Sequence, residues 1–175
     1  MNNLFYLKKH FKNKKVLITG HNGFKGTWMC LIFTFLGAKV IGCGLKKNNN
    51  FTFFKFIKNR IYRNIYVDIC DYKKFYKIIV KEKPTFIIHL AAQALVFESY
   101  KNPLYTFKNN VVSSLNLLEI LRNYKKKIFI VFVTSDKVYK NNEKLSGYIE
   151  NDIIGGDDPY SASKASIEMI LNSYI

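Results

Sequence analysis

Three glycines at regular spacing, Gly20, Gly23 and Gly26, constrain this chain more than any other feature. They separate a short β-branched run, residues 16–19, from a segment with apolar residues at helical spacing. A tight strand-to-helix turn needs glycine where the backbone bends and where the helix approaches the sheet, and the start of that helix favours phosphate charge. The spacing GxxGxxG therefore predicts a dinucleotide-binding turn, although the more usual spacing is GxGxxG.

The apolar pattern repeats along the chain as short strands that alternate with helices. Strands are predicted at residues 16–19, 40–43, 64–67, 85–90 and 128–133, and helices at residues 24–36, 71–81, 103–124 and 161–174. The fourth strand has no polar alternation, which is typical of a parallel sheet covered by helices on both faces. The order predicts an α/β fold with a doubly wound parallel sheet of the Rossmann type.

The first predicted helix carries large apolar residues on one face and ends at Gly37. The residues expected to pack against the core are Phe24, Trp28, Leu31, Ile32 and Phe35. Two polar stretches, residues 46–50 and 140–156, are expected to be the most mobile.

The net charge of +16 raises the question of a polyanionic partner. Only three of the 28 basic residues are arginines, and the 25 lysines are spread along the whole chain. Nucleic-acid surfaces favour the bidentate fork of arginine, so no nucleic-acid partner is predicted.

The three cysteines have no metal-ligand spacing, and their odd number favours a reducing compartment. Lysines interrupt the apolar residues at the start of the sequence before an apolar core of signal-peptide length can form. No apolar stretch approaches the length of about 20 residues that spans a bilayer. These features predict a cytoplasmic protein with no membrane partner and no metal site.

Residues after the third and fourth strands are further candidates for the dinucleotide site. Asp68 is placed to accept a hydrogen bond from an adenine amino group, and its alternative role is a helix-capping or loop carboxylate. The small residues Ala91 and Ala92 leave room for a cofactor. His89 lies in an apolar strand and is expected to be a core histidine.

Tyr160 and Lys164 are one helical turn apart and project from the same helix face. An ammonium beside a phenol stabilises the phenolate, which can accept a hydroxyl proton while hydride leaves the same carbon. The stretch Thr134, Ser135, Asp136 and Lys137 places hydroxyls, a carboxylate and an amine directly after an apolar strand. An acid and a base on one turn are what a β-elimination needs.

Four stretches together resemble one family: GHNGFKG from residue 20, HLAAQ from residue 89, TSDK from residue 134 and PYSASK from residue 159. They resemble the extended short-chain dehydrogenase/reductase family in its nucleotide-sugar branch, and within it the 4,6-dehydratases. The resemblance extends over essentially the whole chain. Asp followed by Lys at 136–137 is similar to the enzymes that act on CDP-glucose, whereas related dehydratases have Asp followed by Glu.

The resemblance implies an NAD-dependent dehydratase that takes a nucleotide sugar, CDP-glucose, and serves deoxysugar formation for surface polysaccharide. Ser135 would hydrogen-bond the sugar 4-hydroxyl together with Tyr160, Asp136 would protonate the departing 6-hydroxyl, and Lys137 would remove the carbon 5 proton. The implied catalytic residues are Ser135, Asp136, Lys137, Tyr160 and Lys164. The expected cofactor contacts are Gly20, Gly23, Phe24, Gly26, Asp68, Ile69, Leu90, Ala91, Ala92, Tyr160 and Lys164.

Two residues depart from the family pattern. Lys46 lies near the position where many NAD-binding folds place a ribose-binding carboxylate, which leaves the choice between NAD and NADP open. Phe97 stands where the family has an arginine, which leaves the substrate contacts open.

Two other functions remain open. A nucleotide-sugar epimerase would keep Tyr160 and Lys164 without needing Asp136 and Lys137, and a catalytically silent dinucleotide-binding protein would need the glycine turn alone. The 175 residues are expected to form one NAD-binding domain that is incomplete at its C-terminus, without a substrate-binding domain. A homo-oligomer or a separate C-terminal chain would then be its partner, with little activity expected from this chain alone.

Overall fold

The computed structural model describes residues 2–46 and 53–174, so residues 47–50 of the polar stretch lie outside the described residues. The chain divides into two compact units. The first runs to Ala91 and includes Ile120–Phe132, and the second contains Ala92–Glu119 and the residues from Val133 onward.

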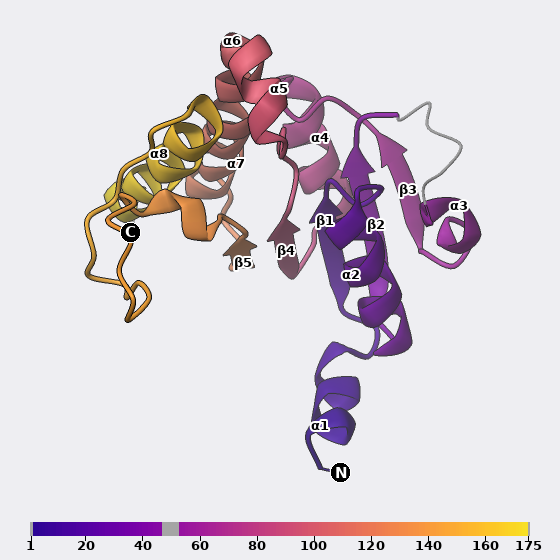
Figure 1. The fold of residues 1–175 in the computed structure, drawn as a ribbon. Coiled ribbons are helices and arrows are strands. Elements are labelled where there is room, and N and C mark those ends of the chain that lie inside the picture. The colour runs from indigo at the N-terminus through magenta and orange to yellow at the C-terminus, as the bar shows by residue number, and fades with distance from the viewer. Residues whose placement is uncertain (1, 47–52, 175) are drawn as a thin grey trace. The chain divides into compact units, whose positions relative to one another are not determined.

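A five-stranded parallel sheet forms the centre of the first unit (Figure 1), with the strand order β3-β2-β1-β4-β5. The strands are β1 (Lys15–Thr19), β2 (Lys39–Gly44), β3 (Arg63–Tyr66), β4 (Phe86–His89) and β5 (Phe129–Phe132). Each differs from its predicted range by at most one residue at either end, and the predicted doubly wound parallel sheet is confirmed. Thr19 aligns with Cys43 on one side and with His89 on the other, so three strands end together at one edge.

Helices cover both faces of this sheet. The chain moves outward from β1 to β3 and then crosses back to β4. Because such crossovers are right-handed, α2 (Phe24–Phe35) and α4 (Tyr72–Glu82) lie on opposite faces, as Figure 1 shows.

The strands supply side chains alternately to two cores. The core on the α2 side contains Val16, Ile18, Cys30, Val40, Phe54, Ile57, Ile61 and Ile88. The alternate strand residues Leu17, Ile41 and Ile87 are fully buried, as are Phe75 and Ile79 of α4. Burial on both faces explains why the strands are continuously apolar in sequence.

The inward face of α2 differs from the prediction. Phe24 is 83% exposed and Phe35 is 61% exposed, and Trp28 and Ile32 are also exposed. The buried residues of α2 are Gly26, Thr27 and Cys30. A Cβ atom on Gly26 would lie 2.2 Å from the Gly20 carbonyl oxygen, so the helix approaches the sheet most closely through its small residues. Leu31 packs against the core as predicted, together with Met29 and Phe33.

Among the described residues, three α-helices lie outside the predicted elements. They are α1 (Asn2–Phe11), α3 (Phe54–Ile57) and α5 (Val96–Lys101). Helix α1 contacts the rest of the first unit through Phe11, whose ring lies 5.0 Å from that of Phe33 and 5.1 Å from that of Phe86. Its other apolar side chains are exposed.

The second unit is helical, and its longest predicted helix, 103–124, is interrupted. It consists of α6 (Pro103–Phe107), the π-helical turn η1 (Lys108–Val112) and α7 (Ser113–Arg122). The unit also contains the short 3₁₀ turn η2 (Asp136–Val138) and α8 (Pro159–Tyr174), which confirms the last predicted helix.

The stretch 140–156 is closed on itself by specific contacts. Tyr139 pairs with Ile154 in an antiparallel bridge, and the Tyr139 and Tyr148 rings stack at 5.3 Å. Lys144 Nζ lies 2.6 Å from an Asp152 carboxylate oxygen, and this contact holds the pKa of Asp152 below its usual range. In the part of the chain that the structure describes, no helix is long and apolar enough to cross a membrane.

Candidate active site

The glycine turn connects β1 to α2. Gly20 has φ +66°, its N–H donates to the Cys43 carbonyl at 2.8 Å, and a Cβ there would meet Ala91 backbone atoms at 2.9 Å. Gly20 is therefore required both by its backbone conformation and by the close approach of the next strand end. Gly23 is the N-cap of α2 and provides no side-chain cap, which leaves the first N–H groups of the helix available to an anion.

Thr19 organises the edge at which β1 and β4 end. Its Oγ1 lies 2.9 Å from His89 Nδ1 and accepts from the N–H groups of Leu90 and Ala91, each at 3.1 Å. His89 is buried and hydrogen-bonded, in agreement with its expected role as a core histidine. The strand end beside the glycine turn is thereby held in place.

The next strand ends carry the remaining first-unit candidates. The Asp68 carboxylate is exposed and accepts from the Cys70 N–H at 2.8 Å, which is a loop-capping contact, while Ile69 is buried. Lys46 is exposed after β2 and no carboxylate follows that strand. Three features fit a dinucleotide: the uncapped N-terminus of α2, the close backbone approach at Gly20, and the Asp68 carboxylate. The carboxylate that would bind the ribose after β2 is missing.

In the second unit, Ser135, Asp136 and Lys137 form the compact turn η2. Ser135 is its N-cap, and its Oγ accepts from the Lys137 N–H at 3.2 Å and donates to Asp136 Oδ1 at 3.0 Å. Asp136 and Lys137 are both exposed. A carboxylate and an ammonium are thus presented side by side from a turn with a fixed backbone.

Helix α8 holds this turn through two side chains spaced four residues apart. Lys164, 6% exposed, donates from Nζ to the Val133 carbonyl at 3.2 Å. Thr134 donates from Oγ1 to Glu168 Oε1 at 2.5 Å. Tyr160 lies one turn before Lys164 on the same helix and is 9% exposed, so α8 carries both residues on one face, from which Lys164 reaches the Val133 carbonyl.

A buried polar cluster underlies α8 and had no role in the sequence prediction. Asn110 is fully buried in η1, and its Nδ2 donates to Ser163 Oγ at 2.8 Å and to the Gln93 carbonyl at 3.1 Å. Its Oδ1 accepts from the Gln93 N–H at 2.7 Å. The π turn places this amide between two segments, and the local sequence, in which Asn109 and Asn110 are adjacent, does not indicate it.

The predicted site residues fall into two groups. Eight cofactor candidates belong to the first unit: Gly20, Gly23, Phe24, Gly26, Asp68, Ile69, Leu90 and Ala91. Six residues belong to the second unit: Ala92, Ser135, Asp136, Lys137, Tyr160 and Lys164. Glu168 and Asn110 join the second group as residues that the sequence did not indicate.

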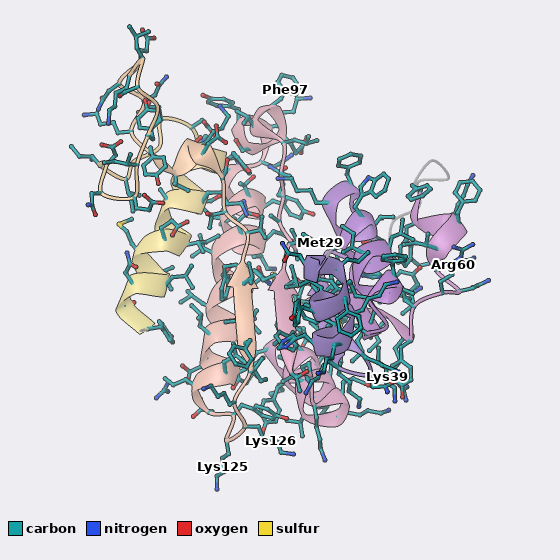
Figure 2. The ribbon with its side chains drawn as sticks, turned by 90° about the horizontal axis from the view of Figure 1, so that it is seen from below. Met29, Lys39, Arg60, Phe97, Lys125 and Lys126 are labelled. Atoms are coloured by element: carbon teal, nitrogen blue, oxygen red, sulfur yellow. The ribbon has the colours of Figure 1, made fainter. Side chains whose placement is uncertain are left out.

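Phe97 lies on α5 and is 72% exposed (Figure 2). The Lys101 ammonium lies 4.5 Å from the centre of its ring. Helix α5 therefore presents a cation one turn beyond Phe97.

The parallel sheet, the glycine turn at its carboxyl edge and the helix with Tyr160 and Lys164 define a nucleotide-binding α/β protein of the Rossmann type. The family model described as GDP-mannose 4,6 dehydratase matches residues 17–175. The chain belongs to this family, which confirms the resemblance to the nucleotide-sugar dehydratases.

Named relatives agree with this assignment. The chain is 38% identical over 168 residues to CDP-glucose 4,6-dehydratase of Salmonella typhimurium, covering 95% of this chain and 47% of the relative. It is similar in structure to the UDP-Glc/GlcNAc 4-epimerase of Campylobacter jejuni, with TM-score 0.80, 26% identity, and coverage of 93% and 49%. It is also similar to Thermus thermophilus UDP-glucose 4-epimerase in complex with NAD, with TM-score 0.76, 27% identity, and coverage of 91% and 50%. The chain spans about half the length of these relatives.

Proposed function

We propose that this chain carries the NAD-binding and catalytic part of a nucleotide-sugar 4,6-dehydratase, with CDP-glucose as the substrate. The observation that carries the proposal is that the second unit contains both sets of residues that a dehydratase needs. Tyr160 and Lys164 serve hydride transfer, and Asp136 and Lys137 serve elimination. The acid and base pair Asp136 and Lys137 sits on a turn whose preceding residues are held by Lys164 and Glu168 of α8. Similarity to the Salmonella enzyme named for CDP-glucose supports the choice of sugar nucleotide.

In this proposal the first unit binds the dinucleotide. The N-terminus of α2 receives the pyrophosphate, because Gly23 leaves its N–H groups uncapped. Gly20 and Gly26 let the turn approach the sheet closely, and the exposed Asp68 carboxylate would accept a hydrogen bond from the adenine amino group. NAD, when bound, supplies a hydride acceptor for carbon 4 of the sugar and returns the hydride to carbon 6.

The second unit moves the protons. Tyr160 accepts the proton of the sugar 4-hydroxyl, which Ser135 orients, as the carbon 4 hydrogen leaves as hydride. The resulting 4-ketone acidifies the hydrogen on carbon 5, and Lys137 removes it. Asp136 protonates the 6-hydroxyl, which leaves as water, so the substrate loses one water molecule with no net oxidation.

Exposure supports the division of roles. Asp136 and Lys137 are exposed and can reach a substrate, whereas Lys164 is buried and holds a backbone carbonyl. Lys164 therefore positions the strand end and places positive charge beside the phenol, while Lys137 takes part in the chemistry.

Mass spectrometry of the product tests the proposal. We expect loss of one water from CDP-glucose in the presence of NAD, with solvent deuterium incorporated at carbon 5. Because the chain spans about half of its relatives, the assay should use both this chain and a chimera that joins it to the C-terminal half of the Salmonella relative. No loss of water from the chimera would contradict the proposal.

Calorimetric titration with NAD and NADP tests the cofactor separately. We expect tighter binding of NAD, because a dehydratase regenerates its cofactor within each turnover. Lys46 is the residue that could attract a 2′-phosphate, so Lys46→Ala should leave NAD affinity nearly unchanged. Tighter binding of NADP would contradict the assignment.

An epimerase is the second candidate, because the two solved structures described above are 4-epimerases. An epimerase needs Tyr160 and Lys164 but has no elimination step for Asp136 and Lys137 to serve. A product of unchanged mass, converted to its 4-epimer, would favour this alternative.

A further inference from the structure

Helix α1 exposes most of its apolar surface. Phe5 is 67% exposed, Tyr6 62%, Leu4 47% and Leu7 46%. Leu4 and Leu7 lie on the same helical stripe as Phe11, since the three follow the spacing i, i+3 and i+7. Phe11 packs against Phe33 and Phe86 of the same unit, whereas the earlier turns of α1 project away from the sheet (Figure 1).

A helix this short has little stability in water unless another surface covers its apolar stripe. α1 has ten residues, and its first turn has no acidic residue that would stabilise the positive end of the helix dipole. The exposed side chains therefore suit a surface that accepts Phe and Leu side chains.

The charge around α1 has a single sign. The sequence contains no aspartate or glutamate before Asp68. Lys8, Lys9, Lys12 and Lys14 are all exposed on α1 or the turn that follows it. The Lys8 ammonium lies 4.2 Å from the centre of the Phe35 ring, which extends the basic and apolar surface onto the exposed face of α2. The surface that covers α1 should therefore be anionic.

An open hollow of about 850 Å³ lies beside the helix. It is lined by Asn3, Tyr6, Leu7, Lys9, His10 and Lys14. Two ammonium groups and two other polar side chains thus surround a space next to apolar chains. Such a site suits a ligand in which a phosphate group is attached to hydrocarbon chains.

Although the sequence alone predicted no membrane partner, we propose that α1 docks the chain on an anionic phospholipid surface, with Leu4, Phe5 and Leu7 entering the headgroup region and the hollow receiving a headgroup phosphate. Amphipathic helices with lysines beside Phe and Leu bind in this manner at the membrane interface, without spanning it. A second copy of this chain is a poorer occupant because its own net charge is +16. Nucleic acid is also a poorer occupant, because the cations here are lysines and the apolar group includes leucines, which do not stack on bases.

Co-sedimentation with vesicles tests the docking. We expect the 175-residue chain to pellet with vesicles of phosphatidylcholine and phosphatidylglycerol, to stay in solution with phosphatidylcholine alone, and to be released by high salt. Equal binding to neutral vesicles, or no binding to either, would overturn the proposal. Formation of a dimer through α1 without lipid would overturn it as well.

Matched variants separate the docking site from general charge. Lys9→Gln with Lys14→Gln should weaken partitioning about twenty-five-fold, at about fivefold for each lysine. Lys73→Gln with Lys77→Gln removes the same charge from exposed positions on α4, on the other face of the sheet from α2, and should change binding far less. Equal weakening by the two pairs would show that net charge alone drives the association.

Insertion is measured by fluorescence. Trp28 is the only tryptophan, so Trp28→Phe combined with Phe5→Trp places a single probe on α1. Brominated lipid should quench this probe in anionic vesicles, whereas inorganic phosphate should leave its emission unchanged. Absence of quenching while the chain pellets with the vesicles would contradict insertion of α1.

Discussion

Lys137 is the residue whose proposed role separates dehydration from simple oxidation. It is exposed on η2, next to Asp136. We expect Lys137→Ala, in the chimera with the Salmonella C-terminal half, to reduce deuterium exchange at carbon 5 about a hundredfold or more. Oxidation at carbon 4 should be less affected, because Tyr160 serves that step. Nuclear magnetic resonance of the product measures the exchange.

Lys140→Ala is the control for this experiment, since it removes an exposed lysine three residues further along. Exchange that is undiminished in Lys137→Ala would assign the carbon 5 proton to another base.

The cysteines differ in burial and therefore in reactivity. Cys30 and Cys43 are fully buried, whereas Cys70 is half-buried. Burial raises the pKa of Cys30 to about 12, and burial together with the Glu82 carboxylate raises the pKa of Cys43 to about 12. Both thiols stay protonated in the folded chain at pH 8, so we expect Ellman's reagent to label Cys70 alone.

Mass spectrometry of the labelled protein identifies the modified residue, and denaturant should expose the other two thiols. The raised pKa values also predict that stability is fully present below about pH 9 and falls as the pH rises toward 12, because the unfolded thiols ionise first. Labelling of Cys30 at the rate of Cys70 would contradict the buried assignment.

At the scale of elements, the contact between η2 and α8 depends on Thr134 and Glu168. Their hydrogen bond is partly buried and involves a carboxylate. We expect a double-mutant cycle of Thr134→Val and Glu168→Ala to give a coupling of about 1–2 kcal/mol in the free energy of unfolding. Urea denaturation followed by circular dichroism measures it.

Thr134→Ser keeps the hydroxyl and should keep most of the coupling. If the effects of the two substitutions on the free energy of unfolding are additive, the hydrogen bond does not hold the turn to the helix.

The glycine turn sets the distance between α2 and the sheet. Gly26→Ala would place a Cβ atom 2.2 Å from the Gly20 carbonyl oxygen. We expect a loss of about 2–3 kcal/mol in the free energy of unfolding, together with weaker NAD binding, because the helix must move away. Gly155→Ala is the control, since its Cβ would lie 3.4 Å from Lys140 Cβ and should cost much less.

Thermal unfolding and calorimetric titration measure the two effects. A Gly26→Ala variant as stable as Gly155→Ala would mean that α2 does not need this close approach.

At the scale of the whole molecule, we expect the 175 residues to bind NAD but to dehydrate CDP-glucose poorly. The relatives named for that activity are about twice as long, and substrate must be positioned by contacts as well as by reactive groups. Turnover assays of this chain and of the chimera measure the difference. Equal turnover numbers would show that the 175 residues position the sugar nucleotide without further help.

Much of the fold could be predicted because its signals are local. Strands buried on both faces contain runs of apolar residues, and Gly20 marks the end of β1. Helix α1 was not predicted because lysines interrupt its pattern and most of its apolar stripe lies outside the core. The π turn at Asn110 was not predicted because it depends on hydrogen bonds to Gln93 and Ser163, which are distant in sequence.

The alternation of strands and helices, the glycine turn and the one-turn spacing of Tyr160 and Lys164 are evident from the residues alone, because each follows from periodicity or backbone geometry over a few residues. Which face of α2 is buried depends on tertiary packing, since periodicity does not reveal that small residues permit the closer approach. The hydrogen bond from Lys164 to the Val133 carbonyl depends on tertiary packing as well. Such a contact depends on packing between segments far apart in the chain, which local sequence does not encode.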